Sequence, residues 1–381
     1  MLRYYFDHNA TTPVSPEVLE AMVPVLAEVY GNASSLHHFG QAARKRLDEA
    51  RRQTASLLGA APEEIVFTSG GTEADNLALL GFGRDAHAIT TTVEHPAVLA
   101  AAAQLASATY VPVDSRGLVD PDDIRGALRP DTKIISVIHA NNELGTIQPI
   151  DEIAEIAREA GVAFHSDGVQ AAGKIAVDVN RLGVTLYSIA GHKLYAPKGV
   201  GALYVRKGTQ LAPILHGGNH ERNRRAGTEN VPGAVALGRA AQWMMEHGPA
   251  ESRRLETLRD RLEASVLDRI PGVRVNGAGA LRVSNTSNLR FDGIDTEPLL
   301  IALDLRGFAV SSGSACSSGA SEPSHVLTAI GLTKEQARSS LRISLGRSND
   351  AGQIDALVDA LTECVARLRK LAPSKPAPAY A

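Results

Sequence analysis

Lys193 and Asp167 are the two residues whose types and positions most directly suggest chemistry. Lys193 ends the sequence AGHK after the apolar run 185–189, and Asp167 ends HSD in the next run upstream, 161–165. Open α/β sheets bind ligands at the carboxyl ends of their strands, so both side chains are expected in one site. A desolvated lysine can form a Schiff base and shuttle protons, and an aspartate can pair with a pyridinium nitrogen. Taken singly, the lysine is equally explained as a surface charge and the aspartate as a helix N-cap.

A glycine turn supplies a candidate anion site. The sequence SGGTE (69–73) stands between an apolar run, 64–68, and a helical pattern that continues through residues 76–80. Backbone amides at the start of a helix suit a phosphate, and Thr72 adds a hydroxyl donor. The pattern is neither GxGxxG nor a Walker loop, so it indicates neither a dinucleotide nor a nucleoside triphosphate. A plain glycine turn with a threonine cap explains it equally well.

The two cysteines differ in their surroundings. Cys316 lies in SSGSACSSG (311–319), a composition typical of an exposed, mobile loop whose thiol is available for nucleophilic attack. Cys364 shares a helical stripe with Leu357, Leu361 and Leu368, so we expect it to be a core residue. Cys316 is therefore the functional candidate.

Short apolar runs that alternate with helical patterns predict an α/β fold with a mostly parallel sheet covered by helices on both faces. A large domain is expected over residues 15–250. Residues 1–14 and 251–371 would form a smaller α+β domain that carries the Cys316 loop and begins with a helix over 252–270, and the Pro/Ala-rich tail 372–381 is expected to be disordered. Expected strands are 64–68, 88–92, 133–138, 161–165, 185–189, 201–205, 273–275, 286–291 and 341–345, with helices from Asp120 and over 151–160.

Bulk composition narrows the function classes. The 381 residues are 44% hydrophobic and 21% charged, which is ordinary for a protein with a sizeable core, and the net charge of −3 argues against nucleic-acid or anionic-membrane surfaces. The sequence shows no signal-peptide pattern and no apolar run of about 18 residues. Two cysteines form neither a disulfide framework nor a structural metal cluster, so a reducing, cytoplasmic location is expected.

Together these motifs resemble the cysteine desulfurases of the NifS/IscS type. That family belongs to the class V aminotransferase group of fold-type I pyridoxal phosphate enzymes. The resemblance runs from YFDHNATTP (5–13) to LRISLGR (341–347), and its specific blocks are TSGGTE (68–73), GHK (191–193) and SGSAC (312–316). The last block is similar to the long-loop branch, group I. The Pro/Ala tail differs from the IscS segment that docks an iron–sulfur scaffold, which favours the NifS-like branch.

The resemblance implies a role for each matching residue. Lys193 would carry pyridoxal 5'-phosphate, and His95 would stack on its ring and relay protons. Cofactor contacts would come from Gly71, Thr72, His95, Asn142, Asp167, Gln170, Gly191, His192, Lys193 and, across a homodimer interface, Thr228. The substrate would be held by Asn32, Asn142 and Arg342. Ala190 stands where many relatives have serine, which removes one presumed phosphate hydroxyl.

The implied reaction converts L-cysteine to L-alanine and leaves a persulfide on Cys316. A sulfur-acceptor or iron–sulfur scaffold protein would then receive the sulfur, for iron–sulfur clusters or thiolated products. No intrinsic metal is implied, although Cys316 could ligate an iron–sulfur cluster transiently. The alternatives are a selenocysteine lyase, another class V lyase, or a non-catalytic assembly platform. The simultaneous presence of Lys193, Asp167 and Cys316 argues against the platform.

Overall fold

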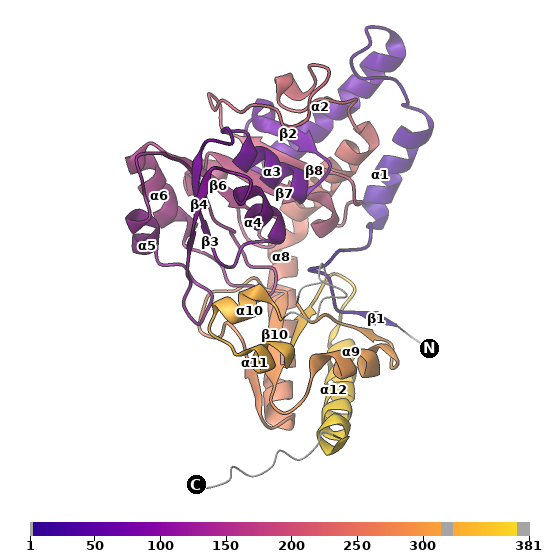
Figure 1. Ribbon diagram of the computed structural model, residues 1–381. Helices are drawn as coiled ribbons and strands as arrows, with labels where there is room; N and C mark the ends of the chain where they lie inside the picture. Colours follow the sequence, from indigo (N-terminus) through magenta and orange to yellow (C-terminus); the bar gives the residue numbers. More distant parts are fainter. Residues whose placement is uncertain (1–2, 314–322, 372–381) are drawn as a thin grey trace.

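The large part of the molecule is built on a seven-stranded sheet. The computed structural model describes residues 3–313 and 323–371 (Figure 1). The strand order is β2-β8-β7-β6-β5-β3-β4; from β7 to β4 all neighbours are parallel, whereas β8 is antiparallel to β2 and β7. The mostly parallel sheet is thus confirmed. Its strands are β2 (Ile65–Thr68), β3 (His87–Thr91), β4 (Ser107–Val111), β5 (Thr132–Ser136), β6 (Ala163–Asp167), β7 (Leu186–Ala190) and β8 (Gly201–Val205).

Helices cover both faces of this sheet, which explains why its strands are apolar rather than alternating. In β2, Ile65 and Phe67 join the core formed with α2 and α8, whereas Val66 joins a second core with α3 and α4. The helices before α8 are α1 (Pro16–Ala27), α2 (His38–Leu58), α3 (Gly71–Leu80), α4 (Pro96–Ala102), α5 (Pro121–Gly126), α6 (Ile150–Ala160) and α7 (Val179–Leu182).

The smaller part has its own core, below the large one in Figure 1. A three-stranded antiparallel sheet, β12-β10-β9, lies beside a short parallel pair, β1-β11. Cys364 is 3% exposed in this core, as the sequence predicted. The elements are β1 (Tyr4–Tyr5), β9 (Val273–Val275), β10 (Thr286–Phe291), α9 (Thr296–Asp304), β11 (Phe308–Ala309), α10 (His325–Ala329), α11 (Lys334–Arg338), β12 (Ser340–Ser344) and α12 (Ala351–Leu371).

One long helix joins the two cores. The helix expected over 252–270 is the second half of α8 (Val231–Arg269), which continues through Pro249. Proline inside a helix costs about 3 kcal/mol, so the sequence favoured a break there. The cost is offset because α8 packs against α1 and α2 in one core and against α12 in the other. The domain division at residue 250 stays a prediction, since α8 crosses it.

Most predicted elements lie within one to three residues of the observed ones. The strands 201–205, 273–275 and 286–291 match throughout, and Asp120 caps α5 by accepting from Asp122 N, as expected. Strand β4 was not predicted; it is the sheet edge, and its Tyr110 is exposed. No described helix combines the length and the apolar character that a membrane span requires.

A tight contact between β6 and β7 fixes the chain beside Asp167. A Cβ added to Gly168 would lie 2.0 Å from ring atoms of Tyr187, which is fully buried in β7. The Tyr187 hydroxyl is held in turn by His139 Nδ1 at 2.7 Å. The ring therefore occupies the volume that any side chain at position 168 would need.

Replacing Gly168 with alanine should consequently destabilise the protein. We expect the free energy of unfolding to fall by about 1–3 kcal/mol, the usual cost of overpacking, in a denaturant titration. Gly126→Ala is the control, because a Cβ at that exposed helical position meets nothing within 4 Å. The double variant Gly168→Ala, Tyr187→Val should lose less than the sum of its single changes. Wild-type stability of Gly168→Ala would contradict this packing.

Candidate active site

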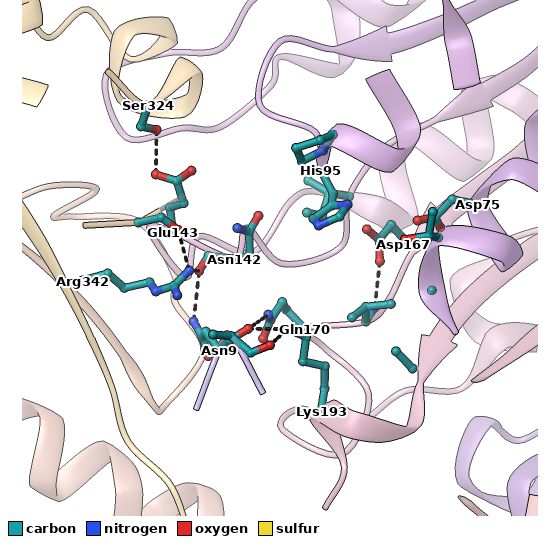
Figure 2. A pocket seen from close by; sticks show the side chains of 18 of the residues that line it. Asn9, Asp75, His95, Asn142, Glu143, Asp167, Gln170, Lys193, Ser324 and Arg342 are labelled. Carbon is teal, nitrogen blue, oxygen red and sulfur yellow. Dashed lines mark hydrogen bonds between the residues drawn. The ribbon is translucent and has the colours of Figure 1, made fainter. Parts of the chain in front are cut away.

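One cavity of about 530 Å³ collects most of the predicted site residues. It opens where β5, β6 and β7 end, and the smaller part closes it with residues from β12 and the start of α10 (Figure 2). Its polar lining includes Asn9, Thr72, Asp75, His95, Asn142, Glu143, Asp167, Gln170, His192, Lys193, Ser324, His325 and Arg342; Gly71 and Ala190 also contribute.

Asp167 lies at the carboxyl end of β6, where the sequence placed it. It is 3% exposed, and Oδ1 accepts from Val169 N at 2.9 Å. Burial raises its pKa, while the charges of His95 and Lys193 act in the opposite direction. A cationic ring nitrogen in the cavity would supply the partner that a buried carboxylate needs.

The predicted anion site is the first turn of α3. The helix begins at Gly71, so the backbone amides of Gly71 and Thr72 face no preceding turn. His192 reaches the same cavity, and burial, with the charges of Lys193 and Lys198, lowers the pKa of its ring to about 4. These are neutral donors around a helix N-terminus, an arrangement that suits phosphate.

The central lysine is held by the N-terminal segment. Lys193, in the 3-10 turn η2 (Gly191–Lys193), donates to Ala10 O at 2.7 Å and to Asn9 O. Gln170 Nε2 donates to the same Asn9 oxygen at 3.0 Å. The lysine amine and the Gln170 amide are therefore neighbours, as a shared cofactor contact requires.

His95 is the N-cap residue of α4. Its Nδ1 accepts from Ala97 N at 3.1 Å, so in the neutral ring Nε2 carries the proton. Burial lowers the pKa of His95, with Asp167 opposing and Lys193 adding to the effect. A neutral imidazole with a fixed tautomer is suited to stacking on a ring and to donating through Nε2.

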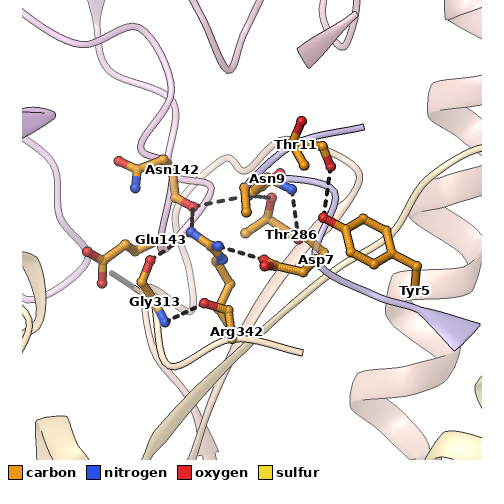
Figure 3. Close-up of polar contacts among 12 residues, drawn as sticks. Tyr5, Asp7, Asn9, Thr11, Asn142, Glu143, Thr286, Gly313 and Arg342 are labelled. Atoms are coloured by element: carbon orange, nitrogen blue, oxygen red, sulfur yellow. Dashed lines mark hydrogen bonds and ion pairs between the residues drawn. The ribbon is translucent and has the colours of Figure 1, made fainter. Parts of the chain in front are cut away.

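Arg342 enters from β12 and is 2% exposed. Its Nη2 donates to Asp7 Oδ1 at 2.7 Å, and Nη1 donates to Gly313 O at 2.8 Å and to Asn142 O at 3.1 Å (Figure 3). Its Nε is buried and has no hydrogen-bond partner among the described residues. The guanidinium thus keeps a donor for an anion.

Four predicted residues do not line this cavity. Asn32 accepts from Ser34 N at 2.8 Å in an exposed turn, and Thr228 is exposed after the 3-10 turn η3 (Glu221–Asn223). Gly191 packs so closely that a Cβ would lie 2.8 Å from Val200, which explains the glycine without a ligand. Cys316 lies outside the described residues.

Sequence reasoning missed several residues of the cavity, among them Asn9, Asp75 and Glu143. Asp75 carried a usable signal, since it lies three and four residues after Thr72 and Gly71 on the same face of α3. Its Oδ1 is buried and has no hydrogen-bond partner, and burial together with Asp167 raises its pKa well above the usual value. Asn9 carried none, because its contacts come from distant parts of the chain.

The described residues fit pyridoxal 5'-phosphate. Asp167 and Asp75 form an acidic floor for the ring nitrogen, and the start of α3 receives a phosphate. Lys193 and Gln170 lie side by side for the aldehyde carbon and the phenolic oxygen. Ala190 is a buried strand end in the lining, so a hydroxyl is absent there.

Comparisons with known proteins agree with this site. The family model described as aminotransferase class-V matches residues 4–357. The chain is 47% identical to "Cysteine desulfurase IscS" of Methanosarcina thermophila over 98% of this chain and 94% of that relative, and 47% identical to "Cysteine desulfurase IscS" of Dictyoglomus turgidum over 97% and 96%.

Solved structures give the same result. The structure titled "NIFS-LIKE PROTEIN" has a TM-score of 0.90 at 35% identity over 96% of this chain and 100% of that chain. The one titled "SspA in complex with cysteine" has a TM-score of 0.80 at 37% identity over 90% and 98%. The predicted family, fold class and cofactor are confirmed: the chain belongs to the class-V aminotransferase family of pyridoxal phosphate enzymes, in the group of the cysteine desulfurases.

Proposed function

We propose that this protein is a homodimeric, cytoplasmic cysteine desulfurase that converts L-cysteine to L-alanine and leaves the sulfur as a persulfide on Cys316. One observation carries the proposal: a single cavity holds Lys193, Asp167, Gln170 and His95 at one side and Arg342 at the other. Bound pyridoxal phosphate supplies an electron sink for the α-carbon. Each further role belongs to a side chain of this chain.

The substrate is positioned by its carboxylate. Arg342 offers its unpaired Nε, and Asn142 lies beside it in the lining. This places the amino group toward Lys193, whose amine removes the α-proton and returns it later. His95, neutral and protonated at Nε2, is placed to donate a proton during the same cycle.

Cys316 supplies the sulfur-accepting nucleophile. Its thiolate attacks the substrate sulfur, the bond between that sulfur and Cβ breaks, and the electron pair passes to the Cβ side, which is protonated to give alanine. The persulfide then passes to an acceptor protein. A free reactive thiol of this kind fits a reducing compartment.

Two features support the homodimer. Leu19, Val23 and Leu26 form an exposed apolar stripe on α1, at 50%, 49% and 55% exposure. Leu36 and Phe39 extend this surface at 90% and 50%. Apolar surface of this kind is typical of an interface, and Thr228, which is exposed here, would reach the partner's phosphate site.

Cys316→Ala should abolish the release of sulfur from L-cysteine and leave the visible absorbance of the bound cofactor intact. The variant removes the nucleophile and no described cavity residue. Sulfide and alanine release would be measured beside cofactor spectra. Cys364→Ala is the matched control; it changes a core residue and should retain activity at some cost in stability. Normal sulfide production by Cys316→Ala would refute the role of Cys316.

Subunit mixing tests whether Thr228 acts across the interface. Lys193→Ala should be inactive, and Thr228→Ala should bind the cofactor more weakly. Unfolding and refolding the two variants together at equal amounts should restore roughly a quarter of wild-type sites, because half of the dimers are mixed and each has one intact site. If Thr228 serves its own subunit, mixing will restore nothing.

A further inference from the structure

A second lysine lies behind the first. Lys174 follows Gln170 by one helical turn's length in the segment after β6, and its Nζ donates to Gln170 Oε1 at 2.5 Å and to Asn9 Oδ1 at 3.1 Å. It does not line the main cavity, but it shares with Lys193 a small adjoining cavity of about 30 Å³. Lys174 therefore touches two residues that touch Lys193 or the cofactor space.

These contacts fix the orientation of the Gln170 amide. An ammonium group only donates, so it selects Oε1, and the Asn9 carbonyl only accepts, so it selects Nε2 at 3.0 Å. With Oε1 bound to Lys174, the group that Gln170 can present to the main cavity is a donor. A donor is what an anionic phenolic oxygen needs.

The two lysines also interact through their charges. Asn9 binds both, Lys174 through its side-chain oxygen and Lys193 through its backbone oxygen. Burial, then the charge of Lys193, then that of Arg342 lower the pKa of Lys174 well below its usual value. Repulsion between two cations is mutual, so the charge of Lys174 favours an uncharged amine on Lys193.

The surroundings leave this repulsion largely uncompensated. His8, from the N-terminal segment, is neutral because burial lowers its pKa to about 4. Glu251 of α8 lines the small cavity but is bound to Arg254 at 2.6 Å. No ion pair joins a carboxylate to Lys174 among residues 3–313 and 323–371.

We propose that Lys174 is a positioning residue of the cofactor site: it holds Gln170 with its amide donor toward the phenolic oxygen, and its charge disfavours a second proton on Lys193 Nζ. The proposal rests on the cofactor placement within the proposed function. It assigns Lys174 a role in the electrostatics of the Lys193 linkage rather than direct contact with substrate.

The test is a pH titration of the visible absorbance of the reconstituted holoenzyme, which reports the protonation of Nζ in its linkage to the cofactor. Lys174→Met removes both the charge and the donor, so the midpoint should rise by about one pH unit, the size expected for one nearby charge. Lys174→Arg keeps charge and donors and should titrate near the wild-type midpoint. Gln170→Leu removes only the amide and should shift the midpoint less than Lys174→Met.

Lys174→Gln guards against failure of the methionine variant to fold, because it is polar but uncharged and should show the same upward shift. A midpoint in Lys174→Met or Lys174→Gln equal to that of the wild type would overturn the proposal. The titration needs bound cofactor and no turnover. Sulfide release by the wild-type protein on addition of L-cysteine tests the proposed function separately, so the two failures are distinguishable.

Discussion

Asn9 is the residue on which the geometry of the cavity depends. It is 2% exposed, and its backbone oxygen accepts from Lys193 and Gln170. Its side chain accepts from Lys174 and Asn285 and donates to Thr286 at 2.8 Å and to Asn142. One buried asparagine thus joins the N-terminal segment, the β6 turn, the η2 turn and the small sheet. Because each group is buried, loss of any contact leaves an unpaired polar atom, which costs about 1–3 kcal/mol.

Charge is separated across this arrangement. Asp167, Asp75 and Glu94 form an acidic group on the side of α3 and α4, and burial raises the pKa of Glu94 to about 8. Lys193 and Arg342, with Lys174 behind, form a cationic group on the other side. His95 interacts with both groups. A ring with a cationic nitrogen and an anionic oxygen matches this polarity in only one orientation, which makes the cavity selective for the direction of the cofactor.

The sequence predicted the parts of the site that have local signals. Asp167 and Lys193 each follow an apolar strand, and Gly71 starts a helix, so each position could be recognised within about ten residues. Asn9 and Asp7 could not, since their partners lie more than a hundred residues away. The same limit hid the continuous α8, where contacts with two distant cores outweigh a local proline signal.

Arg342 shows how the smaller part completes the site. Its positive charge is balanced by Asp7, and two backbone carbonyls bind Nη1, yet Nε stays unpaired in a buried position. An unpaired buried donor destabilises the empty protein, whereas a carboxylate that accepts from Nε removes the penalty. Since Asp7 already neutralises the guanidinium, the gain on binding comes from hydrogen bonding more than from net charge. Under the proposed function, this favours a planar carboxylate presented at one edge of the guanidinium, which is the end of L-cysteine opposite to its sulfur.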